Sequence, residues 1–122
     1  MRIFKNKWFA KFARKEGISD KKLIQAVRDV EAGNIDADYG GGVIKQRIAR
    51  KREGKSGGYR TIILFTKGDK AFFVFGFAKS ELDNLDKSDV RGFKKLAKIM
   101  GSLTPSQLNS LLEKAEIEEI QS

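Results

Sequence analysis

The sequence contains neither cysteine nor histidine. Without cysteine the chain cannot form a disulfide, a thiolate nucleophile or a cysteine-based zinc site, and it suits a reducing cytosol. Without histidine it cannot form a Ser-His-Asp triad, a paired-histidine ribonuclease site or a histidine-dependent metal site. Any catalysis must therefore depend on other side chains.

Long apolar runs and proline-rich linkers are also missing. The apolar run Ala71–Ala78 is far shorter than the roughly 20 residues that span a bilayer. The N-terminus lacks the apolar core of a signal peptide. We therefore expect a cytoplasmic protein, and 122 residues suffice for one compact domain.

Positive charge is abundant, and it is concentrated in one segment. The formal net charge is +9, and residues 43–60 hold seven basic residues and one acidic residue. Residues 61–87 and 88–122 are each balanced. Solubility does not require one sign of charge to be concentrated in this way, so we interpret residues 43–60 as an anion-binding surface.

The apolar spacing predicts the elements of one α+β domain. We expect a mostly antiparallel sheet flanked by helices, in the order β-α-α-β-β-β-α-α. Residues 1–100 form the main part of this domain, and residues 101–122 form its C-terminal helical extension. The expected elements are a strand at 1–4, a helix ending at Gly17, a helix at 20–32, a glycine-rich loop at 36–42, strands at 43–50, 59–66 and 71–78, a helix capped by Ser88 and a helix capped by Thr104.

The basic segment contains a recognisable hairpin pattern. A basic strand, Lys45-Gln46-Arg47-Ile48-Ala49-Arg50-Lys51-Arg52, leads through Gly54-Lys55-Ser56-Gly57-Gly58 into the apolar strand that starts at Tyr59-Arg60. This hairpin resembles the RelE/ParE superfamily of type II toxins, most closely its RelE and HigB-like branch. The segment from Phe77 to Leu85 resembles the family segment after the last core strand, and the resemblance covers roughly residues 1–100.

The resemblance implies a small cytoplasmic toxin with a twisted antiparallel sheet. Many such toxins are endoribonucleases that cut messenger RNA, often on the ribosome, and a cognate antitoxin protein silences them in a complex of the two. The chain departs from this pattern in two places. It lacks a tyrosine near the C-terminal end of the domain, where some members place an acid-base residue, and it adds a helix at 104–113.

RNA cleavage needs no bound metal or other cofactor, because the ribose 2′-hydroxyl can attack the adjacent phosphate. The protein must align the 2′-hydroxyl with the phosphate, provide cationic hydrogen-bond donors to the phosphorane and provide a group that transfers protons. We assign transition-state stabilisation to Arg60 and proton transfer to Lys55 and Lys79. Arg47 completes the catalytic group, and the expected RNA-binding residues are Lys45, Arg50, Lys51, Arg52 and Tyr59.

Several of these assignments have structural alternatives. Lys79 can cap its strand or pair with Glu81, and Tyr59 can pack against the sheet instead of stacking on a base. The chain as a whole can also be a ParE-like inhibitor of DNA gyrase or an RNA-binding module without turnover. We expect the antitoxin to cover the 43–60 hairpin or the neighbouring helix, and we expect Arg60→Ala to affect stability little.

Overall fold

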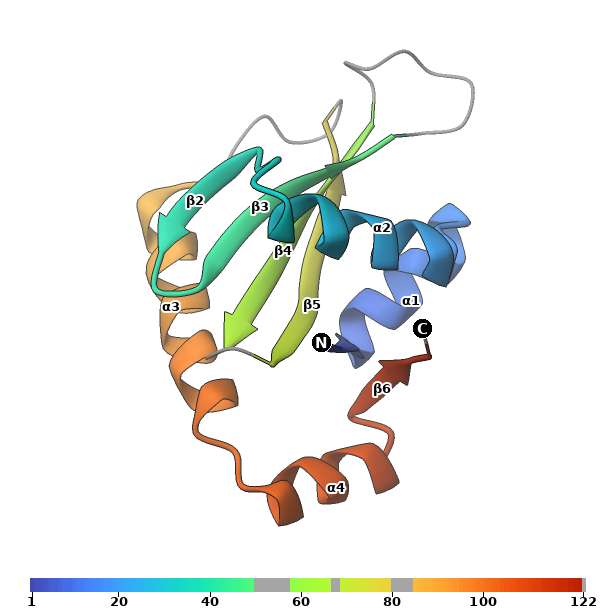
Figure 1. Cartoon of the computed structure of the whole chain (residues 1–122), viewed down its shortest axis with the longest axis vertical. Coiled ribbons are helices and arrows are strands. Elements are labelled where there is room, and N and C mark those ends of the chain that lie inside the picture. The colour runs from blue at the N-terminus through green and yellow to red at the C-terminus, as the bar shows by residue number, and fades with distance from the viewer. Residues whose placement is uncertain (50–57, 67–68, 80–84, 122) are drawn as a thin grey trace.

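A six-stranded sheet organises the chain, and helices pack on both of its faces (Figure 1). The computed structural model describes residues 1–49, 58–66, 69–79 and 85–121. The strand order is β2-β3-β4-β5-β1-β6. The strands are β1 Arg2–Asn6, β2 Ala37–Gly40, β3 Val43–Ile48, β4 Tyr59–Thr66, β5 Lys70–Ala78 and β6 Ile117–Ile120. The helices are α1 Lys7–Glu16, α2 Asp20–Glu31, α3 Lys87–Gly101 and α4 Pro105–Glu113.

The sheet is mostly antiparallel, as predicted. Only the pair formed by β1 and β5 is parallel among the described strands. The central strand β4 is apolar on both faces, with Ile62, Ile63 and Leu64 fully buried. One face packs on α1 and α2, and the other packs on α3 and α4. The α+β class and the core role of the Phe72–Phe77 run are therefore confirmed.

The glycine-rich segment 36–42 is not only a loop. Residues 37–40 form β2, which pairs with β3, and the chain turns tightly at Gly41 and Gly42. Gly42 has a φ of 83°, and an added Cβ would lie 2.3 Å from the Phe65 carbonyl oxygen. The loop prediction is wrong for β2, because pairing with β3 satisfies backbone groups that a local glycine count does not reveal.

The acidic tail forms the opposite edge of the sheet. β6 pairs antiparallel with β1, and Glu119 Oε2 accepts a hydrogen bond of 2.8 Å from Arg2 Nε. This contact lowers the pKa of Glu119 and raises the pKa of Arg2. The sequence predicted a helical extension over residues 101–122, but Ile117–Ile120 form an edge strand instead, because they pair with β1.

Local capping signals set the helix ends. Gly17 ends α1 in a left-handed conformation, Ser19 caps α2, and Thr104 forms a capping box with Gln107 at α4, all as predicted. The predicted cap at Ser88 is wrong, because Asp86 caps α3 and forms a capping box with Asp89. Across the described ranges, no helix has both the length and the apolar character to cross a membrane.

Candidate functional site

Asp36 joins two of the predicted cations at the β2–β3 end of the sheet. Its Oδ2 lies 3.4 Å from Arg60 Nε and 3.6 Å from Lys45 Nζ. Arg47 lies directly opposite Arg60 in the β3–β4 register. We call Lys45, Arg47 and Arg60 the cationic cluster. Sequence reasoning found its three cations but missed Asp36, which holds two of them.

Arg60 is buried within this cluster. It is 6% exposed, and its Nη1 lies 3.5 Å from the Tyr59 carbonyl oxygen. A guanidinium has five N–H donors, so these contacts with Asp36 and Tyr59 do not exhaust it. The sequence placed Arg60 at the polar start of a strand, where a change to alanine would affect stability little. Burial beside Asp36 contradicts that expectation, because removing the guanidinium leaves a carboxylate without this partner.

A hollow of about 340 Å³ lies beside the cluster, between β3 and the chain that follows α2. Asp36 and the exposed residue Arg47 line it, together with Asp29, Asn34, Ile35 and Gln46. This hollow reaches the edge of the cluster, and its lining carries two carboxylates and one guanidinium. Arg47 also lines a second hollow, of about 290 Å³, against α2.

Gln46 positions the segment that carries Asp36. Its Nε2 donates a hydrogen bond of 2.7 Å to the Asn34 carbonyl, and its Oε1 accepts one of 3.0 Å from the Asp36 amide. The side chain is only 4% exposed. The sequence holds a signal for this role, because Gln46 has the same strand parity as the core residues Ile44 and Ile48. A polar residue at such a position needs buried hydrogen-bond partners.

Tyr59 and Lys79 lie in different environments. Tyr59 is 4% exposed, packs edge-on against Phe12 and donates a hydrogen bond of 2.9 Å to Glu16 Oε1. Tyr59 therefore packs against the sheet, as in the structural alternative, and its buried ring is not a platform for stacking a base. Lys79 is exposed just after β5, and its amide donates to the Gly58 carbonyl at 3.3 Å. This contact places Lys79 beside the start of the Arg60 strand.

Four predicted site residues cannot be compared with the structure. Lys55, Arg50, Lys51 and Arg52 lie outside the described residues. Of the five that are described, the structure brings Lys45 and Arg60 together around Asp36 and places Arg47 in register with Arg60. Within the described ranges, no three carboxylates gather in a way that suits a metal ion.

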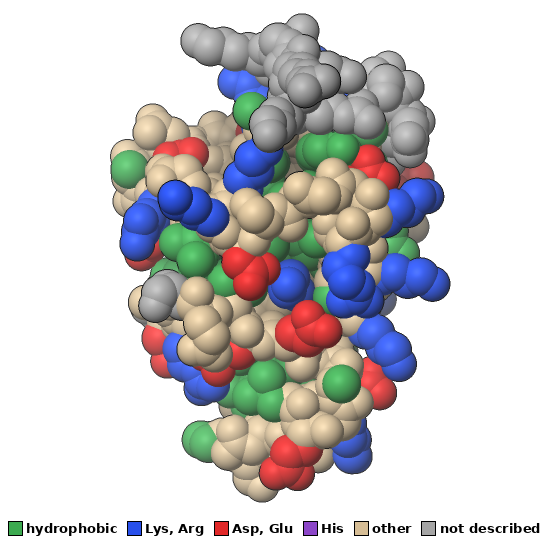
Figure 2. Space-filling view, turned by 90° about the vertical axis from the view of Figure 1, so that its right-hand side faces the viewer, with side chains coloured by type: hydrophobic (Ala, Val, Ile, Leu, Met, Phe, Trp, Pro, Cys, Tyr) green, Lys and Arg blue, Asp and Glu red, His purple; other side chains and the backbone are tan. Residues whose placement is uncertain are grey.

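Another face of the molecule has a different charge pattern. On the side that carries α1 and α2, Lys and Arg side chains are interspersed with Asp and Glu side chains (Figure 2). Ion pairs such as Lys5 with Asp20, at 3.1 Å, belong to this pattern. Mixed charges of this kind favour solubility rather than recognition of a polyanion.

The comparison with protein families identifies the chain's relatives. The family model described as the RelE toxin of the RelE/RelB toxin-antitoxin system matches residues 1–120. The chain belongs to the RelE toxin family. A search of curated protein sequences finds no match.

The family match extends well beyond the basic hairpin at residues 43–60 that carries the sequence resemblance. It includes α4 and β6, which follow the roughly 100 residues that the sequence resemblance covered. As a RelE-family toxin, the chain is one component of a toxin-antitoxin pair. Its cationic cluster is the feature within the described residues that best suits chemistry on a polyanion.

Proposed function

We propose that this RelE-family toxin is an endoribonuclease that cuts messenger RNA in the cytoplasm, in association with the ribosome. The observation that supports the proposal most directly is the cationic cluster, in which a buried arginine and a lysine share one carboxylate. A partly neutralised cluster keeps positive charge for a phosphate. The cognate antitoxin silences the activity.

The proposed reaction is a transesterification within the RNA strand. The ribose O2′ forms a bond to the adjacent phosphorus, the bond from phosphorus to O5′ breaks, and the products carry a 2′,3′-cyclic phosphate and a 5′-hydroxyl. One proton leaves the 2′-hydroxyl and one reaches O5′, so the overall step is proton-neutral. No metal ion or redox partner enters this balance.

Each proposed residue has one task in this reaction. Arg60 donates hydrogen bonds to the charge that develops on the phosphorane, because a preorganised donor at that position lowers the barrier. Arg47 and Lys45 align the strand through its phosphates. Lys55 and Lys79 transfer the protons from the 2′-hydroxyl and to O5′. Arg50, Lys51 and Arg52 extend the phosphate contacts along the RNA.

The Asp36 carboxylate contributes by orientation. Its contact with Arg60 Nε fixes the plane of the guanidinium, so the remaining N–H donors have a defined direction. This arrangement reduces the conformational freedom that would otherwise be lost when the phosphate binds. Asp36 is therefore a positioning residue rather than a catalytic one.

A defined RNA tests the chemistry. The purified toxin is incubated with an mRNA, with and without ribosomes, and we expect products that end in a 2′,3′-cyclic phosphate. A matched RNA with a single 2′-deoxy nucleotide at the cut site should remain intact there, because it lacks the attacking hydroxyl. Cleavage of the deoxy substrate at that site would contradict the proposed reaction.

Mapping of mRNA 5′ ends after induction in cells tests the substrate. We expect new ends inside translated reading frames. Growth arrest with intact mRNA and with DNA damage would instead support inhibition of gyrase. Arrest with neither lesion would support RNA binding without turnover.

A further inference from the structure

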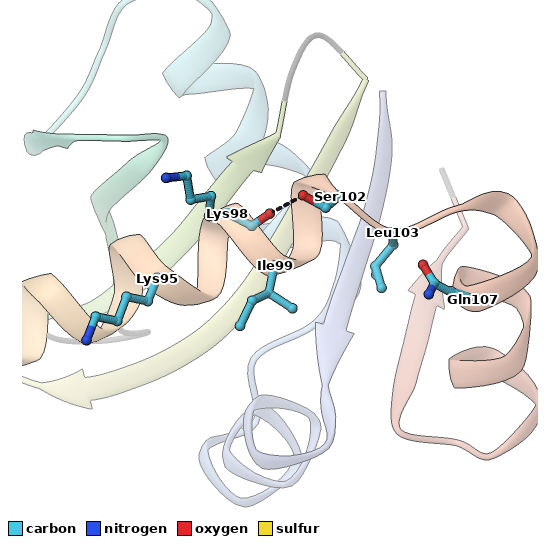
Figure 3. A pocket seen from close by; sticks show the side chains of 6 residues that line it. All are labelled: Lys95, Lys98, Ile99, Ser102, Leu103 and Gln107. Carbon is cyan, nitrogen blue, oxygen red and sulfur yellow. Dashed lines mark hydrogen bonds between the residues drawn. The ribbon is translucent and has the colours of Figure 1, made fainter.

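A groove lies between the C-terminal half of α3 and the start of α4, away from the cationic cluster. It has a volume of about 630 Å³, and most of its lining is apolar. Ile99 and Leu103 project toward the same side, and Gln107 extends from α4 toward Leu103 (Figure 3). We call this feature the α3–α4 groove. Its lining residues are Lys95, Lys98, Ile99, Ser102, Leu103 and Gln107.

The walls of this groove are fixed by local hydrogen bonds. Ser102 Oγ donates to the Lys98 carbonyl at 2.8 Å, which closes the last turn of α3. The Thr104 amide donates to Gln107 Oε1 at 2.9 Å, which holds the side chain of Gln107 at the first turn of α4. The end of the groove at the α3–α4 junction is therefore held in place, and a ligand does not first have to order that end.

An isoleucine is unusually exposed in this groove. Ile99 is 61% exposed, more than Met1, Trp8 and Ile35, which are the other large exposed hydrophobic residues described. A single exposed apolar side chain needs no explanation, but Ile99 lines a concave surface together with the half-buried Leu103. An apolar hollow of this kind suits an apolar side chain from a binding partner.

Basic residues continue the same stripe of α3. Arg91, Lys95, Ile99 and Leu103 follow one another at intervals of four residues, so they lie along one side of the helix and its exit. Within α3, five residues are basic and Asp89 is the acidic one. Lys95 borders the apolar part of the groove, whereas the Lys98 side chain points away from Ile99 and Leu103 (Figure 3). The surface therefore combines two apolar positions with a positively charged border.

We propose that the α3–α4 groove is a docking site for an acidic, amphipathic segment of the antitoxin. The inference rests on the toxin's proposed function with an antitoxin as its inhibitor, and it adds the place where that inhibitor binds. Apolar side chains of the segment fill the hollow over Ile99 and Leu103, and its carboxylates face Lys95 and Arg91. Charge complementarity with α3 is what selects this partner.

A peptide fits this groove better than RNA does. RNA would satisfy the lysines through its phosphates but would leave Ile99 and Leu103 facing polar backbone. A peptide segment with one apolar and one acidic face satisfies both parts. None of the residues that line the groove belongs to the cationic cluster, so the site differs from direct masking of that cluster.

Binding of the full-length antitoxin, purified separately, tests the proposal by titration against variants of the toxin. Ile99→Glu places a carboxylate in the hollow, and we expect affinity to fall by at least ~30-fold, the loss typical of a central interface residue. Lys95→Glu should weaken binding by roughly 5- to 10-fold, with a larger effect at low salt. The matched control is Lys11→Glu, which makes the same charge change on an exposed position of α1 and should leave affinity unchanged.

Further measurements on the same variants keep the test decisive. Circular dichroism and thermal unfolding check that Ile99→Glu folds, and if it does not, the comparison of Lys95→Glu with Lys11→Glu decides. Hydrogen exchange should show protection of residues 95–108 on antitoxin binding. Without antitoxin, Ile99→Glu should cleave RNA at the wild-type rate. With antitoxin present, its cleavage should be inhibited less than that of the wild type.

The outcomes separate this proposal from the proposed function. Unchanged antitoxin affinity in Ile99→Glu and Lys95→Glu overturns the docking site, whatever the catalytic activity. Protection of residues 95–108 by RNA but not by antitoxin, or concentration-dependent self-association lost in Ile99→Glu, would also overturn it. Absence of RNA cleavage by the wild type contradicts the ribonuclease proposal and leaves the binding result to be judged on its own.

Discussion

The two edges of the sheet differ in the ratio of cations to carboxylates among their ion pairs. At the β1–β6 edge, Arg2 pairs with Glu119, Arg14 with Glu118, and Lys5 with both Asp20 and Glu118. At the β2–β3 edge, Asp36 alone contacts both Lys45 and Arg60 in the ion pairs described, and Arg47 lies in register beside them.

This difference shows that the number of cations does not identify a binding surface. A cation with its own carboxylate produces little field at a distance, whereas cations that share a carboxylate leave a net positive potential. The sequence order hides the contrast, because Glu118 and Glu119 of the β1–β6 edge lie more than 100 residues from Arg2. The tertiary pairing decides which cations are available.

The largest effect expected is on catalysis at the buried arginine. Arg60→Gln should lower the rate of RNA cleavage by ~10²- to 10³-fold, because it removes a preorganised charged donor from the phosphorane. Arg2→Gln makes the same change at the β1–β6 edge and should leave the rate unchanged. Single-turnover cleavage kinetics of folded protein measure both, and an equal loss in the two variants would contradict the assignment of the β2–β3 edge as the active one.

The next effect concerns the carboxylates that hold the cations. Asp36→Asn should lower the free energy of unfolding by ~1–3 kcal/mol, because Arg60 is nearly buried and loses a charged partner. Glu118→Gln removes a carboxylate that is 45% exposed and should cost less than ~1 kcal/mol. Urea unfolding at pH 7 measures both, and a larger loss for Glu118→Gln would reverse the comparison.

A smaller effect should appear in the salt dependence of RNA binding. If residues 43–60 contact about six phosphates of a single strand, the logarithm of affinity should fall with the logarithm of salt concentration with a slope near ~4. Lys45→Gln should reduce that slope by ~0.7, the contribution of one phosphate. Lys5 has a side chain of similar exposure, 13% against 15%, and Lys5→Gln should leave the slope unchanged. Equal changes in the two variants would show that net charge, not position, controls binding.

The smallest effect expected is the pH dependence of the β1–β6 edge. The contact with Arg2 lowers the pKa of Glu119, so its stabilisation is complete above the ordinary glutamate pKa and is lost as the pH falls through the lowered value. Glu119→Gln should therefore reduce stability by less than ~1 kcal/mol at pH 7, because the pair is partly exposed. The difference from wild type should disappear at pH values well below 4, as measured by thermal unfolding. A difference that grows on acidification would contradict the pairing.

Much of the fold could be predicted from local patterns. Gly17, Ser19 and the Thr104–Gln107 box act over a few residues, and the apolar strands at 59–66 and 71–78 are long enough to be distinctive. The strands β2 and β6 were missed because each has four residues. Their pairing partners are β3 and β1, and no pattern within four residues specifies such a partner.

The candidate site was predicted only in part for the same reason. The sequence identified Lys45, Arg47 and Arg60 as basic positions on a hairpin, because strand alternation is a local property. It did not find Asp36 or Gln46, and it placed Arg60 at the polar start of a strand. Asp36 reaches Arg60 only after the segment following α2 is held against β3 by hydrogen bonds with the Gln46 side chain.

The α3–α4 groove gives a second example. The sequence predicted both helices, with caps at Ser88 and Thr104. The approach of the two helices leaves Ile99 exposed beside Leu103, and helical periodicity alone does not predict that. Helix periodicity describes one helix, whereas a groove depends on the packing of two.

By itself the sequence determined the α+β class, the family resemblance, the apolar core strands and the position of the excess positive charge. These properties depend on composition and on spacing within single elements. The tertiary structure decided that Lys45 and Arg60 share the Asp36 carboxylate, that the Tyr59 ring is buried and that Ile99 stays exposed in the α3–α4 groove. Those outcomes depend on side chains far apart in the chain, whose charge and burial interactions exist only after the sheet has brought its two edges into place.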